Sequence, residues 1–317
     1  MRLVFICSFG GAVGYGHLKR CATLSLHARK SQIDTILLCI SHEAHSDSPS
    51  ALATALLGEF SRSSICHSLS EAVESGLIKN SDVLILDSYD AYPLIELLSE
   101  RVSNVLSFTD EIIHDLFVSD NTVQVCFSGI DCPERIDPNS PLWKSIDLIP
   151  LLPPEVTLAR PVEYLGVKRP ILVYPGGNGS SVCEDIVQYL QSLYSDHEHF
   201  SFFCPSVCTL DIKGMTYISG NKGLLAHIYH SHILITAAGN CLLEGNAFKI
   251  PAISFCTHQN QVESLSCIKA CAPHRILCWG SQRIDPVLID DFARDLAAPK
   301  TVISRSPLLQ LIKLRCK

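Results

Sequence analysis

The stretch LVFICSFGGAVGYGHLKRCATLSLHARK, residues 3 to 30, decides the fold. It opens with an apolar run of strand length at residues 3–7, and a glycine-rich segment follows at residues 10–16. From residue 17 to residue 30 the apolar side chains recur at a spacing that suits one face of a helix. Strand, glycine loop and helix in this order open a βαβ unit, so the stretch predicts a parallel sheet with ligand-binding loops at the carboxyl ends of its strands.

The same alternation of strand and helix signals continues along the whole chain. In the first half, strands are expected at residues 3–7, 35–40, 83–87 and 105–108, and helices at residues 17–30, 50–60 and 93–101. A proline-rich segment at residues 149–161 is the best linker, because clustered prolines fit neither a helix interior nor a central strand. In the second half, strands are expected at residues 171–174, 200–203, 215–218, 233–236 and 252–255, and helices at residues 183–193, 223–230 and 242–248. The sequence therefore predicts an α/β protein with two Rossmann-like domains, residues 1–152 and 153–317, which face each other across a cleft.

The composition of the chain indicates which classes of binding partner are not expected. A chain of 317 residues, 47% hydrophobic and 18% charged, is typical of a well-packed globular protein with two cores. A net charge of -7 and the lack of a Lys/Arg block argue against nucleic acid as a partner. No apolar run approaches the roughly 18 residues that cross a bilayer, so membrane insertion is not expected either. The 15 cysteines, without an export signal, predict reduced thiols and a cytoplasmic location.

Neither glycine loop matches a common cofactor motif. In a dinucleotide loop of the form GxGxxG, Lys19 would occupy the place of the third glycine, which weakens a nicotinamide site. Glu43, just past the second expected strand, keeps that alternative open as a ribose-binding acid. No Gly-Lys-Ser/Thr ending supports a Walker A loop, and no CxxC pair or completed His cluster supports a metal site. We therefore expect neither cofactor nor metal.

His17 is the strongest candidate for chemistry. It falls in the expected first turn of a helix, where the partial positive charge of the helix favours a neutral ring that can accept a proton. Its place after glycines at the carboxyl end of a strand favours a functional role. The alternative is that His17 only caps or packs the helix.

Several motifs together resemble one enzyme family. The loop Gly14-Tyr15-Gly16-His17 with Arg20, the segments LILDSYD (84–90) and LSFTDE (106–111), and in the second half ILVYPGGNGSS (171–181) and AAGNCLLEGNAFKIPAISFCTHQNQ (237–261) follow the family's order and spacing. They are similar to the UDP-sugar hydrolases of pseudaminic acid biosynthesis. Members of that family remove UDP from UDP-2,4-diacetamido-2,4,6-trideoxy-β-L-altropyranose and have a two-domain fold like that of GT-B glycosyltransferases.

The resemblance implies a site divided between the two domains. His17 would be the catalytic residue, and substrate contacts in the first domain would come from Gly14, Tyr15, Gly16, Arg20, Asp87, Tyr89 and Asp110. In the second domain UDP would be bound by Gly176, Gly177, Gly239, Asn240, Glu244, Asn260 and Gln261.

These positions also have individual physical interpretations. Backbone N–H groups of the Gly239–Asn240 turn before a helix can hold a diphosphate, and Glu244 can accept hydrogen bonds from ribose hydroxyls. Each has a simpler alternative: Glu244 could be a solvated helix acid, and the Asn260–Gln261 pair an ordinary polar turn. Arg20 could steer phosphate or be an ordinary surface arginine. Asp87 or Asp110 could orient His17 or the sugar, and either could equally be a strand-end acid that caps a loop.

Three functions remain open on the sequence. The first is hydrolysis at the anomeric carbon with inversion, in which His17 activates water. The second is a GT-B glycosyltransferase that uses the same UDP site and a hydroxyl acceptor. The third is an inactive nucleotide-sugar-binding homologue, suggested by Gly179, where the family usually has Asp, and by Asn240-Cys241, where it has small hydroxyl residues.

Overall fold

The structure is a computed structural model. It describes residues 2–10, 13–42, 51–88, 95–109, 122–126, 142–144, 152–153, 158–176, 179–193, 200–206, 208, 210, 212–218, 223–257, 260–271 and 276–279. The chain divides into two compact units, one of Met1–Pro154 with Ser304–Lys317 and one of Glu155–Ile303. The functions assigned above to the two halves stay predictions.

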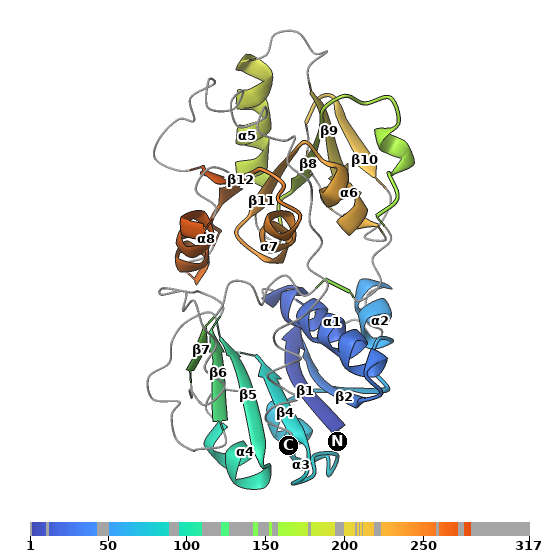
Figure 1. The fold of residues 1–317 in the computed structure, drawn as a ribbon, viewed down its shortest axis with the longest axis vertical. Coiled ribbons are helices and arrows are strands. Elements are labelled where there is room, and N and C mark those ends of the chain that lie inside the picture. Colours follow the sequence, from blue (N-terminus) through green and yellow to red (C-terminus); the bar gives the residue numbers. More distant parts are fainter. Residues whose placement is uncertain are drawn as a thin grey trace. The chain divides into compact units, whose positions relative to one another are not determined.

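The first unit is built on a parallel sheet of seven strands in the order β3-β2-β1-β4-β5-β6-β7 (Figure 1). Its strands are β1 (Arg2–Phe9), β2 (Asp34–Ser41), β3 (Arg62–Cys66), β4 (Val83–Asp87), β5 (Asn104–Thr109), β6 (Thr122–Cys126) and β7 (Leu142–Lys144). Its helices are α1 (Gly16–Lys30), α2 (Ala51–Leu57), α3 (Leu69–Glu74) and α4 (Ile95–Arg101).

The apolar sequence of the central strand β1 agrees with its position, since both of its faces are covered by other parts of the unit. Val4 and Ile6 pack in a core with residues of α3 and α4. The ring of Phe5 packs edge-on against Phe60, which follows α2, with 5.3 Å between the ring centroids. A strand buried on both faces has a nearly continuous hydrophobic sequence, as β1 does.

The second unit repeats this plan with six parallel strands in the order β10-β9-β8-β11-β12-β13. Its strands are β8 (Pro170–Tyr174), β9 (Ser201–Pro205), β10 (Met215–Ile218), β11 (Ile233–Ala237), β12 (Ala252–Phe255) and β13 (Ile276–Cys278). Its helices are α5 (Ser180–Leu193), α6 (Leu224–His230), α7 (Asn240–Ala247) and α8 (Asn260–Cys271), with a short 3-10 turn η5 (Val162–Tyr164). Ile186 and Leu190 of α5 pack on Ile171 and Val173 of β8 to form the core of this unit.

The strands and helices expected from the sequence are present, with small differences at their ends. The helix expected at residues 242–248 begins two residues earlier, at Asn240, and the helix expected at residues 50–60 ends at Leu57. Additional elements are β3, α3, β6, β7, α8 and β13. In both sheets the first strand of the unit lies between its second and its fourth, which places the reversal of strand order at β1/β4 and at β8/β11. Open parallel sheets bind their ligands beside the carboxyl ends of the strands at this reversal.

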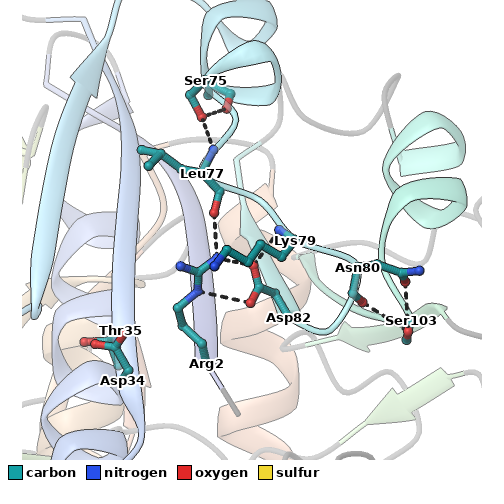
Figure 2. Close-up of polar contacts among 10 residues, drawn as sticks. Arg2, Asp34, Thr35, Ser75, Leu77, Lys79, Asn80, Asp82 and Ser103 are labelled. Carbon is teal, nitrogen blue, oxygen red and sulfur yellow. Dashed lines mark hydrogen bonds and ion pairs between the residues drawn. The ribbon is translucent and has the colours of Figure 1, made fainter.

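A part-buried ion pair lies at the amino ends of the central strands β1 and β4 (Figure 2). Arg2 at the start of β1 donates Nε and Nη2 to the carboxylate of Asp82, just before β4, at 3.0 and 2.6 Å. Arg2 also donates to the Leu77 carbonyl, and Asp82 accepts from the Lys79 backbone N–H, both at 2.7 Å. These bonds join the amino ends of the two strands whose carboxyl ends carry the site described next.

Candidate active site

The loop between β1 and α1 is shaped by its glycines. Gly10 and Gly14 form a small antiparallel bridge, in which the Gly10 N–H donates to the Gly14 carbonyl at 2.8 Å. Gly14 has a φ of 70°, a backbone conformation that residues other than glycine rarely adopt. The Tyr15 ring lies 6.1 Å from the Phe9 ring, and α1 begins at Gly16. His17 is therefore in the first turn of α1, as expected, and only 9% of its surface is exposed.

Asp87 lies beside this histidine, at the carboxyl end of β4. It pairs in register with Cys7 of β1, so both residues lie at the reversal of strand order in the first sheet. Its carboxylate is fully buried, and Oδ1 lies 2.6 Å from Nδ1 of His17. The structure thus brings together two residues that are 70 positions apart, in the arrangement that the sequence offered as one possible role of Asp87.

This contact fixes the tautomer of the His17 ring. Asp87 Oδ1 is an acceptor when ionised, so at 2.6 Å His17 Nδ1 must carry the hydrogen. The nearby Nη2 of Arg20, 3.1 Å from Nδ1, is also a donor, so it and the histidine share the same carboxylate rather than bonding to each other. In the neutral ring Nε2 is then the nitrogen that accepts a proton.

Arg20 and Cys21 complete the surroundings of the Asp87 carboxylate. Arg20 donates Nε to Oδ2 at 2.7 Å and Nη2 to Oδ1 at 2.5 Å, while the Cys21 thiol donates to Oδ2 at 3.7 Å. Burial alone would raise the pKa of Asp87, but the charges and hydrogen bonds of Arg20 and His17 outweigh it and hold that pKa well below its usual range. Asp87 is therefore an ionised carboxylate in a buried position.

Sequence reasoning placed Arg20 on the substrate and did not select Cys21. Both are on the face of α1 that carries His17, because residues three and four positions apart are neighbours on a helix. The spacing of four residues from His17 was the sequence signal that could have identified Cys21 as part of the site. Tyr89 and Asp110 lie outside the described residues, and Gly16 is the exposed first residue of α1.

The second unit has an equivalent place at β8/β11. Gly176, with a φ of 70°, follows β8, and a Cβ built on it would lie 3.5 Å from that of Ala237, the last residue of β11. Gly239 caps α7, and Asn240 is the first residue of that helix. Backbone N–H groups at the start of a helix face outward without helical partners, which is the arrangement that binds anions. Gly177 lies outside the described residues.

Glu244 lies one turn into α7 and is 4% exposed. The alternative of a solvated helix acid is therefore wrong, because this side chain is buried. Tyr174, at the end of β8, shares its surroundings: burial, then the thiols of Cys241 and Cys208, and then Glu244 raise the pKa of the Tyr174 phenol. Sequence reasoning did not select Tyr174, although its position as the last residue of the strand before the glycine loop was a signal.

The structure gives a packing reason for Gly179. A Cβ at this residue would lie 2.2 Å from the Pro175 carbonyl oxygen and 2.6 Å from the Phe255 ring. Real Cβ atoms do not come so close, so this chain cannot carry an Asp here without moving β12 or the loop after β8.

The Asn260–Gln261 pair begins α8. Gln261 Oε1 accepts from the Thr257 backbone N–H at 2.8 Å and from its hydroxyl at 3.2 Å, so the amide oxygen orders the turn before the helix. A ligand would have to use the amide nitrogen of this side chain. The Asn260 side chain lies outside the described residues.

Within the described residues, no group of three or more His, Cys, Asp or Glu side chains is arranged to hold a metal ion. In the same part of the chain no helix is both long and apolar enough to cross a membrane.

No protein-family model matches the chain, and no curated protein matches it in sequence. Solved structures do match. A protein assigned as a UDP-N-acetylglucosamine 2-epimerase from Listeria monocytogenes aligns with a TM-score of 0.62 at 10% identity, over 99% of this chain and 96% of the other. MurG of Acinetobacter baumannii aligns with a TM-score of 0.52 at 12% identity, over 100% and 94%. Arabidopsis thaliana UGT89C1, complexed with UDP, aligns with a TM-score of 0.53 at 14% identity, over 99% and 94%.

Identities this low establish likeness of fold and nothing finer. Together with the two parallel Rossmann-like sheets, the matches confirm the fold class expected from the sequence. The chain has an α/β fold of the GT-B type.

Proposed function

We propose that this chain is a nucleotide-sugar hydrolase. It would cleave a UDP-linked diacetamido-trideoxy-hexose at the anomeric carbon and release UDP and the free sugar with inversion, as a step of pseudaminic acid biosynthesis. The observation that carries the proposal is the 2.6 Å contact between His17 Nδ1 and the buried Asp87 carboxylate, which directs Nε2 to act as the base. A base of this kind suits an enzyme that must activate a weak nucleophile such as water.

The chemistry requires one proton transfer and one displacement. His17 Nε2 takes a proton from a water molecule as the water oxygen bonds to the anomeric carbon. The bond from that carbon to the diphosphate oxygen breaks on the opposite face, and its electron pair leaves with UDP. Asp87 stabilises the imidazolium that forms, without itself taking the proton.

The second unit supports a nucleotide in this proposal. The N–H groups at the start of α7, beside Gly239, would hold the diphosphate, and Glu244 would accept hydrogen bonds from the ribose. Solved structures of the same fold include UGT89C1 complexed with UDP and with UDP-L-rhamnose. Gly176, Asn240 and the amide of Gln261 are further proposed contacts.

A glycosyltransferase is the second candidate, and the similar structures favour it to the extent that several are glycosyltransferases by name. The same base would then deprotonate an acceptor hydroxyl instead of water. The argument for the third candidate, an inactive homologue, is weaker than the sequence suggested, because packing against Phe255 explains why residue 179 is glycine.

One experiment separates the three candidates. The purified protein is incubated with the UDP-diacetamido-sugar alone, UDP release is measured, and the assay is repeated with His17→Ala. Acceptor-independent release that the variant loses supports hydrolysis. Release that appears only with an added acceptor alcohol would establish a transferase, and binding of the UDP-sugar without turnover would establish the inactive homologue.

A further inference from the structure

We propose that Arg20 is a positioning residue for the catalytic base: its guanidinium holds the Asp87 carboxylate aimed at Nδ1 of His17. This role replaces the expected contact with substrate phosphate. The inference rests on the proposed function only in treating His17 as the base.

The first support is geometric. The guanidinium meets both carboxylate oxygens of Asp87, through Nε at 2.7 Å and Nη2 at 2.5 Å. Such a two-point contact fixes the plane of the carboxylate, which a single hydrogen bond does not. The Arg20 side chain is 10% exposed and that of Asp87 is not exposed at all, so little solvent competes for these bonds. Oδ1, held by Arg20, is the oxygen that faces His17.

The second support is the balance of charge around the pair. The titratable groups that face Asp87 among the described residues are His17, Arg20 and Cys21 of α1, with Cys7 of β1 behind them. Burial and the neighbouring Cys7 thiol raise the pKa of Cys21 well above its ordinary value, so this sulfur keeps its proton. Arg20 is then the permanent cation that balances the buried carboxylate.

Arg20 also lies beside the histidine ring itself. Its Nη2 is 3.1 Å from His17 Nδ1, and both nitrogens direct their hydrogens to Asp87 Oδ1. Without Arg20 the carboxylate would be free to turn, and His17 Nδ1 would lose the fixed acceptor that keeps the ring hydrogen on it.

Two variants and a control test this role in the hydrolysis assay. Arg20→Gln should lower kcat about tenfold with KM unchanged, because the carboxylate no longer holds the ring hydrogen on Nδ1. Arg20→Lys keeps the charge but cannot make the two-point contact, so it should recover only part of that loss. Arg29→Gln removes the same charge from an exposed position on the same helix and should change neither quantity. A raised KM in Arg20→Gln or Arg20→Lys, with kcat unchanged, would mean that Arg20 binds substrate and would overturn the proposal.

The tautomer of the histidine ring, read by NMR, gives a readout that needs no turnover. Signals of His17 are assigned by their loss in His17→Gln, and the ring nitrogens are compared without substrate in the wild type and in Arg20→Gln. We expect the Nδ1–H tautomer in the wild type and a mixture with the Nε2–H tautomer in the folded variant. An unchanged tautomer in that variant refutes the role of Arg20, whether or not the protein cleaves a UDP-sugar. A changed tautomer in a protein that hydrolyses nothing would refute the proposed function and leave the role of Arg20 standing.

Discussion

Replacing Asp87 with Asn removes one charge from the buried pair and leaves the side-chain shape almost unchanged. In the transition state His17 becomes an imidazolium 2.6 Å from this carboxylate. At an effective dielectric constant near 20, two unit charges at that distance attract by roughly 6 kcal/mol, a ceiling of about 10⁴-fold in rate. The Asn amide keeps part of the dipole, so we expect kcat to fall by about 10³-fold.

The amide also disturbs the tautomer. Its NH₂ group can donate to Nδ1 of His17, which would move the ring hydrogen to Nε2 and block the proposed base. The assay is UDP release at saturating substrate across pH, with Asp34→Asn, an exposed Asp of the same unit, as the control. Activity within about threefold of wild type in a folded Asp87→Asn protein would refute the role of the pair.

Stability against pH shows whether the variant has lost the intended charge. Because the pKa of Asp87 is depressed in the folded protein, its ionisation stabilises the fold above the ordinary Asp pKa of about 4. This stabilisation is lost as pH falls from about 4 through the folded pKa, at about 1.4 kcal/mol for each unit of depression. Thermal unfolding of Asp87→Asn should therefore show a lower midpoint at neutral pH and a weaker dependence between about pH 4 and pH 2. An identical acid dependence in both proteins would contradict the ionised state assigned to Asp87.

Three further changes test the fold and the nucleotide site. Asp82→Ala leaves the Arg2 guanidinium without its carboxylate, so urea unfolding should show a loss of about 2 kcal/mol, less than for a fully buried pair because the Arg2 side chain is 19% exposed; a loss below about 0.5 kcal/mol would contradict the structural role of the pair. Gly179→Ala places a Cβ 2.2 Å from the Pro175 carbonyl oxygen and should cost about 1–3 kcal/mol, seen as a lower Tm; an unchanged Tm would show that the loop has room. Glu244→Gln should weaken UDP binding about tenfold by calorimetry, because the amide is a poorer acceptor for ribose hydroxyls than a carboxylate; unchanged affinity would remove Glu244 from the nucleotide site.

The fold was predictable where buried strands carry a strong apolar signal. β1, β4 and β11 are apolar runs bounded by polar or glycine residues, and their assignment needed no tertiary information. The edge strand β3, with the sequence RSSIC, gave no such signal, because Cys66 is its one buried residue. Its strand conformation depends on pairing with β2, a contact that local sequence does not encode.

The site was predictable residue by residue, and the sequence offered the pairing of Asp87 with His17 only as one of several possibilities. His17 follows from the glycine loop, and Asp87 follows from the end of a strand. Their contact depends on β1 lying beside β4 in the sheet, which joins residues 70 positions apart. The contact of Arg20 with Asp87 depends on the same adjacency, so the local sequence gave no signal for it. For Gln261 the sequence suggested a nucleotide contact but not the local bond of its side chain to Thr257 at the start of α8.

The destination of the water oxygen shows directly which bond of the UDP-sugar is cleaved. Hydrolysis of the UDP-diacetamido-sugar is run in H₂¹⁸O, and UDP and the sugar are analysed at once by mass spectrometry, with the anomer of the nascent sugar read by NMR. Attack at the anomeric carbon, assisted by His17, predicts one ¹⁸O on the sugar, none on UDP, and an inverted first-formed anomer. Label on UDP, or retention at the anomeric carbon, would contradict the account.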